Sequence, residues 1–292
     1  MSGFRKLHKK LKSYSKFQQL TKSIQMVALS KLRFVQNKVN VRRTALTYIK
    51  RLFEHRNLAY TNMLLVPITS DRSSCGPIND IITNHAKNIV FDLKNRKKHT
   101  KVFLIGRKGK FTLRKQCLNE LVKNVYNLNK EPLSLLVATI VLEKMEKYEF
   151  DKCMILFHRF HSVMNQKPTQ YTILSYNSFL ANILLQTSTN DIDKNKTEIN
   201  SLFFFSLLLE KGLKDEFFFN DLHQFSFSVI LLDALEENEL SELGARACAM
   251  ENASQNAKKL ISALELQYNK ARQANITNEL IEIVSCVESL SS

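Results

Sequence analysis

Apolar residues recur at intervals of three and four along the first fifty residues of the chain. This spacing places them on one stripe of an α-helix. No Pro or Gly lies between residues 4 and 66, so no helix breaker interrupts the pattern. About 50 residues rising 1.5 Å each give a helix of roughly 75 Å, which needs a partner along its length. The stripe comprises Phe4, Leu7, Leu11, Tyr14, Phe17, Leu20, Ile24, Val27, Leu32, Val35, Val39, Leu46, Ile49 and Phe53.

The C-terminal part of the chain offers that partner. Residues 213–292 contain one Gly and no Pro, and Ser254 and Asn275 interrupt an otherwise regular apolar rhythm. The two ends therefore predict a long antiparallel coiled coil, with residues 1–60 and 201–292 as its arms. The C-terminal stripe comprises Leu240, Leu243, Ala247, Met250, Ala257, Ile261, Leu264, Tyr268 and Ala271.

The two ends also differ in charge. Residues 1–53 contain fourteen Lys or Arg and no acid, whereas residues 233–292 contain ten acids and five Lys or Arg. Opposite charge favours pairing, but an exposed ion pair contributes only about 0.2–1 kcal/mol. We therefore expect the apolar seam to supply most of the stability of the coil.

The middle of the chain, residues 61–200, has a different pattern. Short apolar runs at 64–68, 101–105, 153–160 and 170–174 predict strands. Helical patterns at 78–89, 111–125 and 133–148 alternate with them, which predicts βαβ units and a mainly parallel sheet. A polar loop is expected at 187–200. The fold class is thus α/β, with a central domain between two coiled-coil arms.

Composition limits the function without fixing it. The net charge of +16 favours acidic proteins, nucleic acid or anionic membranes as partners. No apolar run approaches eighteen residues, which excludes a transmembrane helix. The five cysteines form no CxxC pair, which argues against a disulfide framework, against a zinc site and for a reduced compartment.

The candidate catalytic groups of the middle region are weak. The glycines and basic residues of 106–109 follow a strand, but their spacing is that of neither known phosphate-binding motif, and a turn explains them better. Residues 71–73 are expected to form a turn and a helix cap. His158 and His161 are interpreted as structural. No nucleophile–base set or metal-ligand spacing is present in the sequence, so it predicts no catalysis, no cofactor and no metal.

Several segments together resemble the gamma subunit of rotary ATP synthases. They are residues 20–31 (LTKSIQMVALSK), 70–76 (SDRSSCG), 241–257 and 268–285, with Phe160, Ser162, Gln166, Pro168 and Thr169 between them. The sequence departs from the family at Ser73 and Ser74, which replace Gly-Leu in the SDR motif. Ile24 stands where the family usually has Met, and Cys286 where it usually has Gly.

The resemblance implies a non-catalytic rotor shaft. In the family, the terminal helices form a coiled coil inside a ring of alternating catalytic and non-catalytic subunits, and a Rossmann-like α/β domain lies near the membrane ring. The implied partners are the alpha and beta subunits, delta/epsilon-type stalk subunits and the c-ring, with membrane contact only through the complex and no nucleic acid. The residues that this resemblance assigns to rotor–stator contacts are Thr21, Lys22, Ile24, Met26, Lys31, Arg72, Arg272, Gln273, Thr277 and Glu279.

The family helix begins almost at Met1, so we expect no long cleaved leader. The basic, amphipathic first fifty-three residues could act as an uncleaved mitochondrial targeting signal. The expected location is the matrix side of the mitochondrial inner membrane, and the alternative is the cytoplasmic face of a bacterial membrane. The alternative function is a basic coiled-coil protein that binds nucleic acid or an anionic surface.

Overall fold

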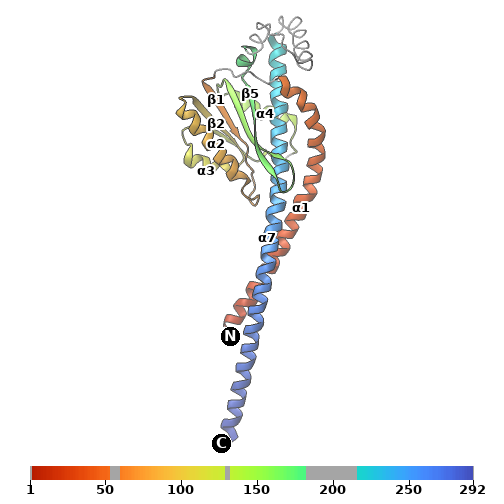
Figure 1. Cartoon of the computed structure of the whole chain (residues 1–292), viewed down its shortest axis with the longest axis vertical. Coiled ribbons are helices and arrows are strands. Elements are labelled where there is room, and N and C mark those ends of the chain that lie inside the picture. The colour runs from red at the N-terminus through yellow and green to blue at the C-terminus, as the bar shows by residue number, and fades with distance from the viewer. Residues whose placement is uncertain (1, 53–59, 129–131, 182–215, 292) are drawn as a thin grey trace. The chain divides into compact units, whose positions relative to one another are not determined.

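The chain forms two compact units that share two long helices. The computed structural model describes residues 2–52, 60–128, 132–181 and 216–291 (Figure 1). Residues 30–245 form one unit, called here the sheet unit, and residues 1–29 with 246–292 form the other, called the coil unit. Helix α1 (Ser2–Leu52) and helix α7 (Glu216–Ser291) each contribute to both units. The two long helices expected from the apolar stripes are confirmed.

A five-stranded sheet organises the sheet unit. Its order is β3-β2-β1-β4-β5, and the first four of these strands are parallel, whereas β4 and β5 form an antiparallel hairpin. The mainly parallel sheet is therefore confirmed. The strands are β1 (Asn62–Pro67), β2 (His99–Ile105), β3 (Leu121–Val125), β4 (Lys152–Phe160) and β5 (Gln166–Leu174).

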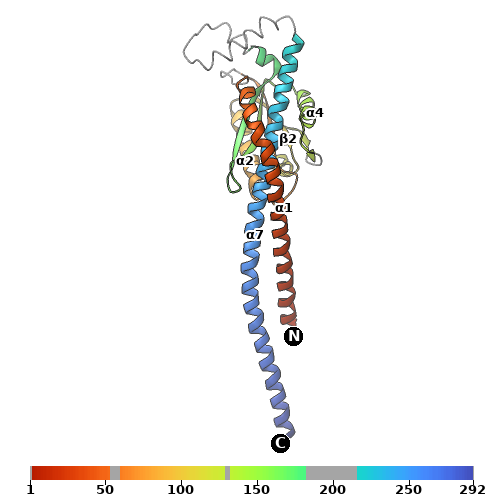
Figure 2. The same cartoon turned by 90° about the vertical axis from the view of Figure 1, so that its right-hand side faces the viewer.

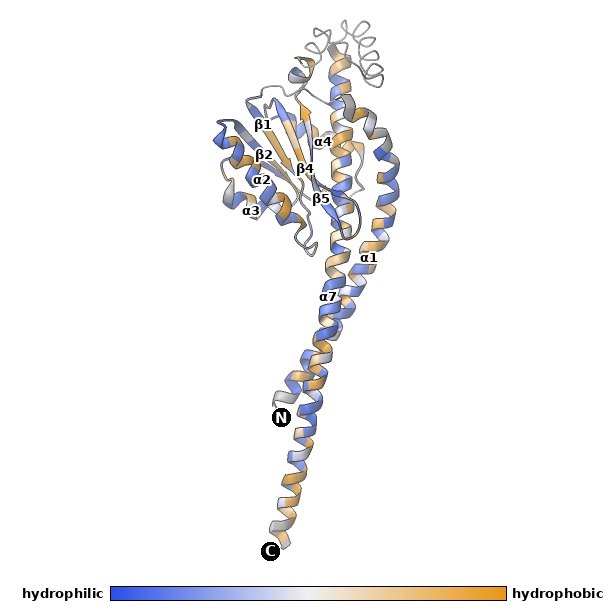
Figure 3. Cartoon of the chain, in the orientation of Figure 1, coloured by the Kyte–Doolittle hydropathy of each residue, from blue (hydrophilic) through white to orange (hydrophobic). Residues whose placement is uncertain are grey.

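Helices cover both faces of this sheet. Successive strand residues point to opposite faces, so Leu64 and Leu65 enter two different hydrophobic clusters. Leu65 packs with α2 (Ile78–Asn95) and α3 (Gly109–Gln116). Leu64 packs on the other face, in a cluster to which α4 (Leu135–Glu146) and the first part of α7 contribute. Burial on both faces explains the apolar runs in the strands, which are visible in Figure 3.

The predicted helix at 111–125 is wrong in its second half. Helix α3 ends at Gln116, because Cys117 leaves the helical region with φ −134° and ψ 52°. Strand β3 follows, and its β-branched Val122 and Val125 suit a pleated strand better than a helix. The free edge of β2 supplies the partners: the Gly106 amide donates to the Val125 carbonyl at 2.7 Å. The predicted loop at 187–200 lies outside the described residues.

In the coil unit, α1 and α7 run side by side in opposite directions (Figure 2). The α7 seam is as predicted, since Ala257 is buried and Ile261, Leu264 and Tyr268 are half-buried. The predicted α1 stripe is wrong at four positions, whose side chains are exposed: Tyr14, Phe17, Leu20 and Val27. The Tyr268 ring lies 5.8 Å from the ring of His8 in α1. The antiparallel coiled coil is confirmed. No helix in the described ranges has enough length and apolar character to cross a membrane.

We expect Ile261→Asp to weaken the coil more than Lys258→Asp or Lys259→Asp does. Ile261 is half-buried in the seam, where a carboxylate replaces apolar packing and loses part of its hydration. Lys258 and Lys259 are exposed on the same helix, so an acid there remains hydrated. Thermal unfolding of the three variants makes the comparison. An equal loss of stability in all three would show that the seam is assigned wrongly.

Candidate functional site

The crevice where a sheet of this kind usually binds its ligand is filled by α7. In open parallel sheets, ligands bind outside the carboxyl ends of the strands where the strand order reverses, which here lies beside β1. The cavity at this place has a volume of about 20 Å³, room for roughly one water molecule. Thr69 and Gly106 line it from the strand ends, and Asn238, Glu239 and Glu242 line it from α7. A nucleotide has no space there.

Polar side chains of α7 bond directly to the end of β4. The Asn238 side-chain oxygen accepts a hydrogen bond from the His158 amide at 3.3 Å, and the Ser241 hydroxyl donates to the His158 carbonyl at 2.9 Å. The Glu237 carboxylate accepts from the Phe160 amide at 3.1 Å. Because these bonds satisfy buried backbone groups, they hold α7 against the strand ends.

The glycines at 106 and 109 form a tight turn between β2 and α3, as predicted. Gly106 has φ +102°, and a Cβ built on it would lie 2.0 Å from the Thr69 carbonyl oxygen. The Gly109 amide donates to the Thr69 hydroxyl at 3.2 Å. The backbone of this turn is thus packed against the end of β1 and does not form a phosphate cradle.

The SDR segment is a second structural loop at the same edge. Asp71 does not cap a helix, so that part of the prediction is wrong: α2 begins at Ile78 after Pro77 and has no side-chain cap. The Asp71 carboxylate instead accepts hydrogen bonds from the amides of Arg107 at 3.1 Å and Asn127 at 2.8 Å. It therefore ties together the loops that follow β1, β2 and β3.

Some of the predicted contact residues gather in a groove of the coil unit. The groove has a volume of about 410 Å³, and Arg272 and Glu279, which are seven residues apart on α7, both line it. Arg5 of α1 adds a second cation, and the other lining residues are Asn275, Ile276, Asn278 and Glu282. Gln273 and Thr277 are exposed outside the groove, and the Thr277 hydroxyl donates to the Gln273 carbonyl at 2.9 Å.

The remaining predicted contact residues are dispersed. On α1, Thr21 is buried and donates to the Gln18 carbonyl at 2.9 Å, Ile24 is half-buried, and Lys22 and Met26 are exposed. In the sheet unit, Lys31 and Arg72 are exposed. The Arg72 carbonyl accepts from the Ser70 hydroxyl at 2.7 Å and from the Cys75 thiol at 3.2 Å.

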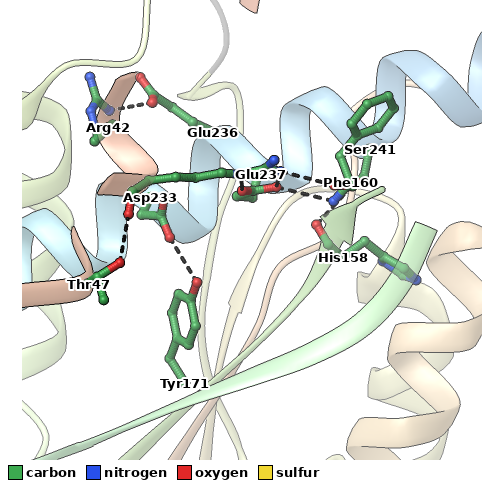
Figure 4. Close-up of polar contacts among 10 residues, drawn as sticks. Arg42, Thr47, His158, Phe160, Tyr171, Asp233, Glu236, Glu237 and Ser241 are labelled. Carbon is green, nitrogen blue, oxygen red and sulfur yellow. Dashed lines mark hydrogen bonds and ion pairs between the residues drawn. The ribbon is translucent and has the colours of Figure 1, made fainter. Parts of the chain in front are cut away.

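A buried charged network in the sheet unit was missed by the sequence interpretation (Figure 4). Arg43 of α1 forms a bidentate pair with Glu237, with Nε to Oε1 at 2.5 Å and Nη2 to Oε2 at 2.8 Å. Arg42 pairs with Glu236, and the Tyr171 hydroxyl donates to Asp233 at 2.9 Å. A signal for it exists: acids recur at helical spacing inside the apolar stretch 229–240, and two arginines fill the gap in the α1 stripe between residues 39 and 46.

Burial and pairing set the protonation of this network. The hydrogen bond that Arg43 donates to Glu237 raises the pKa of Arg43, so the charge of Arg43 is permanent. Burial raises the pKa of Glu236, and its ion pair with Arg42 acts in the opposite direction. Burial and the neighbouring Asp233 raise the pKa of Tyr171, so its hydroxyl stays protonated and donates.

Comparison with known proteins gives consistent matches over the whole chain. The family described as ATP synthase matches residues 3–290. The chain is similar to the mitochondrial ATP synthase subunit gamma of Arabidopsis thaliana, with 30% identity over 97% of this chain and 84% of the plant protein. It is 29% identical to the ATP synthase gamma chain of Pelagibacter ubique (strain HTCC1062), over 97% of this chain and 98% of the bacterial one. A chain in the cryo-EM structure of the Euglena gracilis mitochondrial ATP synthase rotor, rotational state 1, matches with a TM-score of 0.81 and 26% identity, over 94% of this chain and 99% of that one.

We expect Gly106→Ala to destabilise the sheet unit by about 3 kcal/mol or more, because the new methyl group meets backbone at a positive φ. Gly76→Ala is the matched control, since Gly76 has φ +61° but a Cβ there meets nothing within 4 Å. It should cost only about 1–2 kcal/mol. Urea unfolding of both variants measures the difference, and equal losses would contradict the close approach to Thr69.

We expect His158 to make the stability of the chain depend on pH. The side chain is buried, its Nε2 atom has no hydrogen-bond partner among the described residues, and burial lowers its pKa to about 4. The unfolded chain binds this proton near pH 6.5, so the stability is present above that pH and is lost as the pH falls toward 4. The loss from this group between pH 7 and about pH 5 is about 2 kcal/mol.

Replacing His158 by Leu should flatten this pH dependence. His223, whose pKa is also lowered by burial, remains in both proteins, so the comparison isolates His158. Urea unfolding of both proteins at the two pH values is the measurement. A variant that loses as much stability as the wild type would contradict the assignment.

Proposed function

The chain belongs to the family of ATP synthase gamma subunits, and from this premise we propose that it is the central rotor shaft of a proton-driven ATP synthase and is itself non-catalytic. Rotation of the membrane c-ring turns the shaft, and the shaft changes the conformation of the catalytic sites in the surrounding hexamer. The partners are the alpha and beta subunits, the delta/epsilon-type stalk subunits and the c-ring. The observation that carries the proposal is the antiparallel pairing of α1 and α7 in the coil unit. Each of these two helices also contributes to the sheet unit.

The filled crevice supports the non-catalytic part of the proposal. The carboxyl edge of the sheet is where this fold class binds nucleotides, and here side chains of α7 occupy it. Nucleotide chemistry therefore belongs to the subunits around the shaft. The contribution of the shaft to ATP synthesis is mechanical, because its asymmetric contacts with the surrounding subunits change as the shaft turns.

The exposed side chains of the coil unit support the proposal that this unit contacts the hexamer. Arg272 and Arg5 line one groove, and the guanidinium fork of Arg272 suits bidentate pairing with a partner carboxylate. The last turns of α7 expose apolar side chains, which mark a surface that a partner covers. These are Ile276, Leu280, Ile281, Ile283, Val284, Val287 and Leu290.

We assign the other contacts by the exposure of their side chains on α1 and on the loop that follows β1. Lys22 and Met26 are exposed on α1, and Lys31 and Arg72 are exposed in the sheet unit, so all four side chains are accessible to a stator subunit. Thr21 and Ile24 lie closer to the seam and would act by shaping it. Fourteen Lys or Arg and no acid in residues 1–53 favour transient pairing with acidic loops of the catalytic subunits.

The proposed location is the matrix side of the mitochondrial inner membrane. The similarity to a mitochondrial subunit of Arabidopsis thaliana supports it. The relative from Pelagibacter ubique is bacterial, so the cytoplasmic face of a bacterial membrane is the alternative. In either location, contact with the membrane is made through the complex.

We expect Arg272→Ala combined with Gln273→Ala to lower ATP synthesis while the complex still assembles. Both side chains are exposed, so their loss removes contacts to the stator and leaves the seam of the coil intact. Loss of one or two charge-assisted contacts of about 1.5–3 kcal/mol each should reduce the synthesis rate about tenfold or more. Synthesis by vesicles containing the purified complex is the measurement.

The matched control is Lys258→Ala combined with Gln267→Ala. It also removes one cation and one amide from the exposed side of α7, at positions outside the groove. Its synthesis rate should stay near that of the wild type. If the Arg272 and Gln273 variant also synthesises ATP at the wild-type rate, these two residues are ordinary helix surface.

A further inference from the structure

Three elements of the sheet unit meet at one side chain, Arg43. It lies on α1, pairs with Glu237 of α7, and its Nη2 also donates to the carbonyl of Phe160, the last residue of β4, at 3.0 Å. We propose that Arg43 is a positioning residue that locks both shaft helices to the sheet, so that a turn of the α/β part is carried to α1 and α7 together. This inference rests on the rotor function proposed above.

The geometry uses the Nε and Nη2 atoms of the guanidinium together. Two nitrogens of Arg43 face the two carboxylate oxygens of Glu237, and one of them also reaches the Phe160 carbonyl. The Phe160 amide donates to the same carboxylate at 3.1 Å, so both backbone groups of this strand residue are held. A point-charge ammonium cannot hold two acceptors in this arrangement, because it lacks the planar fork.

Packing holds the end of the hairpin in the same place. The Phe160 side chain belongs to a hydrophobic cluster with Leu32 and Val39 of α1 and Leu240 and Leu243 of α7. Gly244 permits this approach, since a Cβ there would lie 2.9 Å from Phe160 Cε2. The hairpin end is therefore wedged against both helices, next to the charged pair.

Because Glu237 is buried, its ion pair with Arg43 resists sliding of α1 along α7 more than apolar contacts do. Glu237 is 1% exposed, so moving its partner away leaves a buried carboxylate without its counter-charge, which is strongly unfavourable. Apolar side chains can shift past one another with a smaller change in energy, because their attraction is non-directional. Asn238 and Ser241 bond α7 to β4, and Arg43 brings α1 into the same connection.

Arg42 provides a matched comparison. It pairs with Glu236 and thus joins α1 to α7, one residue away from Arg43. The described contacts of Arg42 include no bond to the sheet. Arg42→Lys and Arg43→Lys make the same chemical change on adjacent residues, and only the second weakens a connection to β4.

The test is torsional stiffness in the assembled complex. The hexamer is fixed to a surface and held in one catalytic state by a non-hydrolysable nucleotide, and a rod is attached at the exposed α3. Thermal fluctuations of the rod angle then report the stiffness between the α/β part and the held coil. We expect Arg43→Lys to increase the angular variance about twofold or more, with Arg42→Lys close to the wild type.

A purely structural role for Arg43 predicts lower thermal stability or yield but an unchanged angular variance in the complexes that assemble, and that result would overturn the inference. If Arg43→Lys does not assemble, Glu237→Gln, which keeps the shape of the side chain, is measured in the same way with the same two outcomes. Failure of the wild-type chain to form a rotating complex would overturn the rotor function itself, which is a different result from a rotating complex with unchanged stiffness.

Discussion

The sheet unit depends on charged and polar side chains that α7 buries against the ends of the strands. Asp233, Glu237, Asn238 and Ser241 lie on one part of this helix, and each meets a partner from β4, β5 or α1. Buried carboxylates are costly without partners, so the helix is stable in this position only when the hairpin and α1 are correctly placed. The same requirement excludes a ligand from the crevice and fixes the orientation of both long helices on the sheet.

This arrangement also explains where the family resemblance lies. The segments 70–76 and 241–245 and the residues from Phe160 to Thr169 are far apart in sequence, yet all of them lie in the sheet unit. Ser241 binds the end of β4, Gly244 admits the Phe160 ring, and Asp71 joins three loops. These residues hold the helices on the sheet. Within the sheet unit, the residues that carry the family resemblance therefore serve packing.

The elements with a strong period were predictable from the sequence, and the exceptions have physical causes. A stripe repeated over fifty residues identified α1, and buried apolar runs identified β1, β2, β4 and β5. Strand β3 was missed because it is a short edge strand, whose formation depends on hydrogen bonds from β2 more than on its own pattern. Arg43 and Glu237 were missed because charged residues are expected on the surface until the fold shows that Glu237 is buried and that Arg43 is its partner. The rotor–stator contacts stay predictions, since they depend on subunits outside this chain. The domain division at residues 60 and 200 also stays a prediction, since helices α1 and α7 contribute to both compact units.

The chemistry of the Arg43 junction has one more consequence. A motor driven by protons works between compartments whose proton concentrations differ and change with demand. Carboxylates with raised pKa values, such as Glu236 and Glu239 on α7, titrate closer to the range in which such changes occur. The guanidinium of Arg43, with its pKa raised further by Glu237, does not titrate there at all. Arg43 therefore carries the same charge whatever the proton gradient across the membrane. The gradient can vary without changing the charge that connects α1 and α7 to β4.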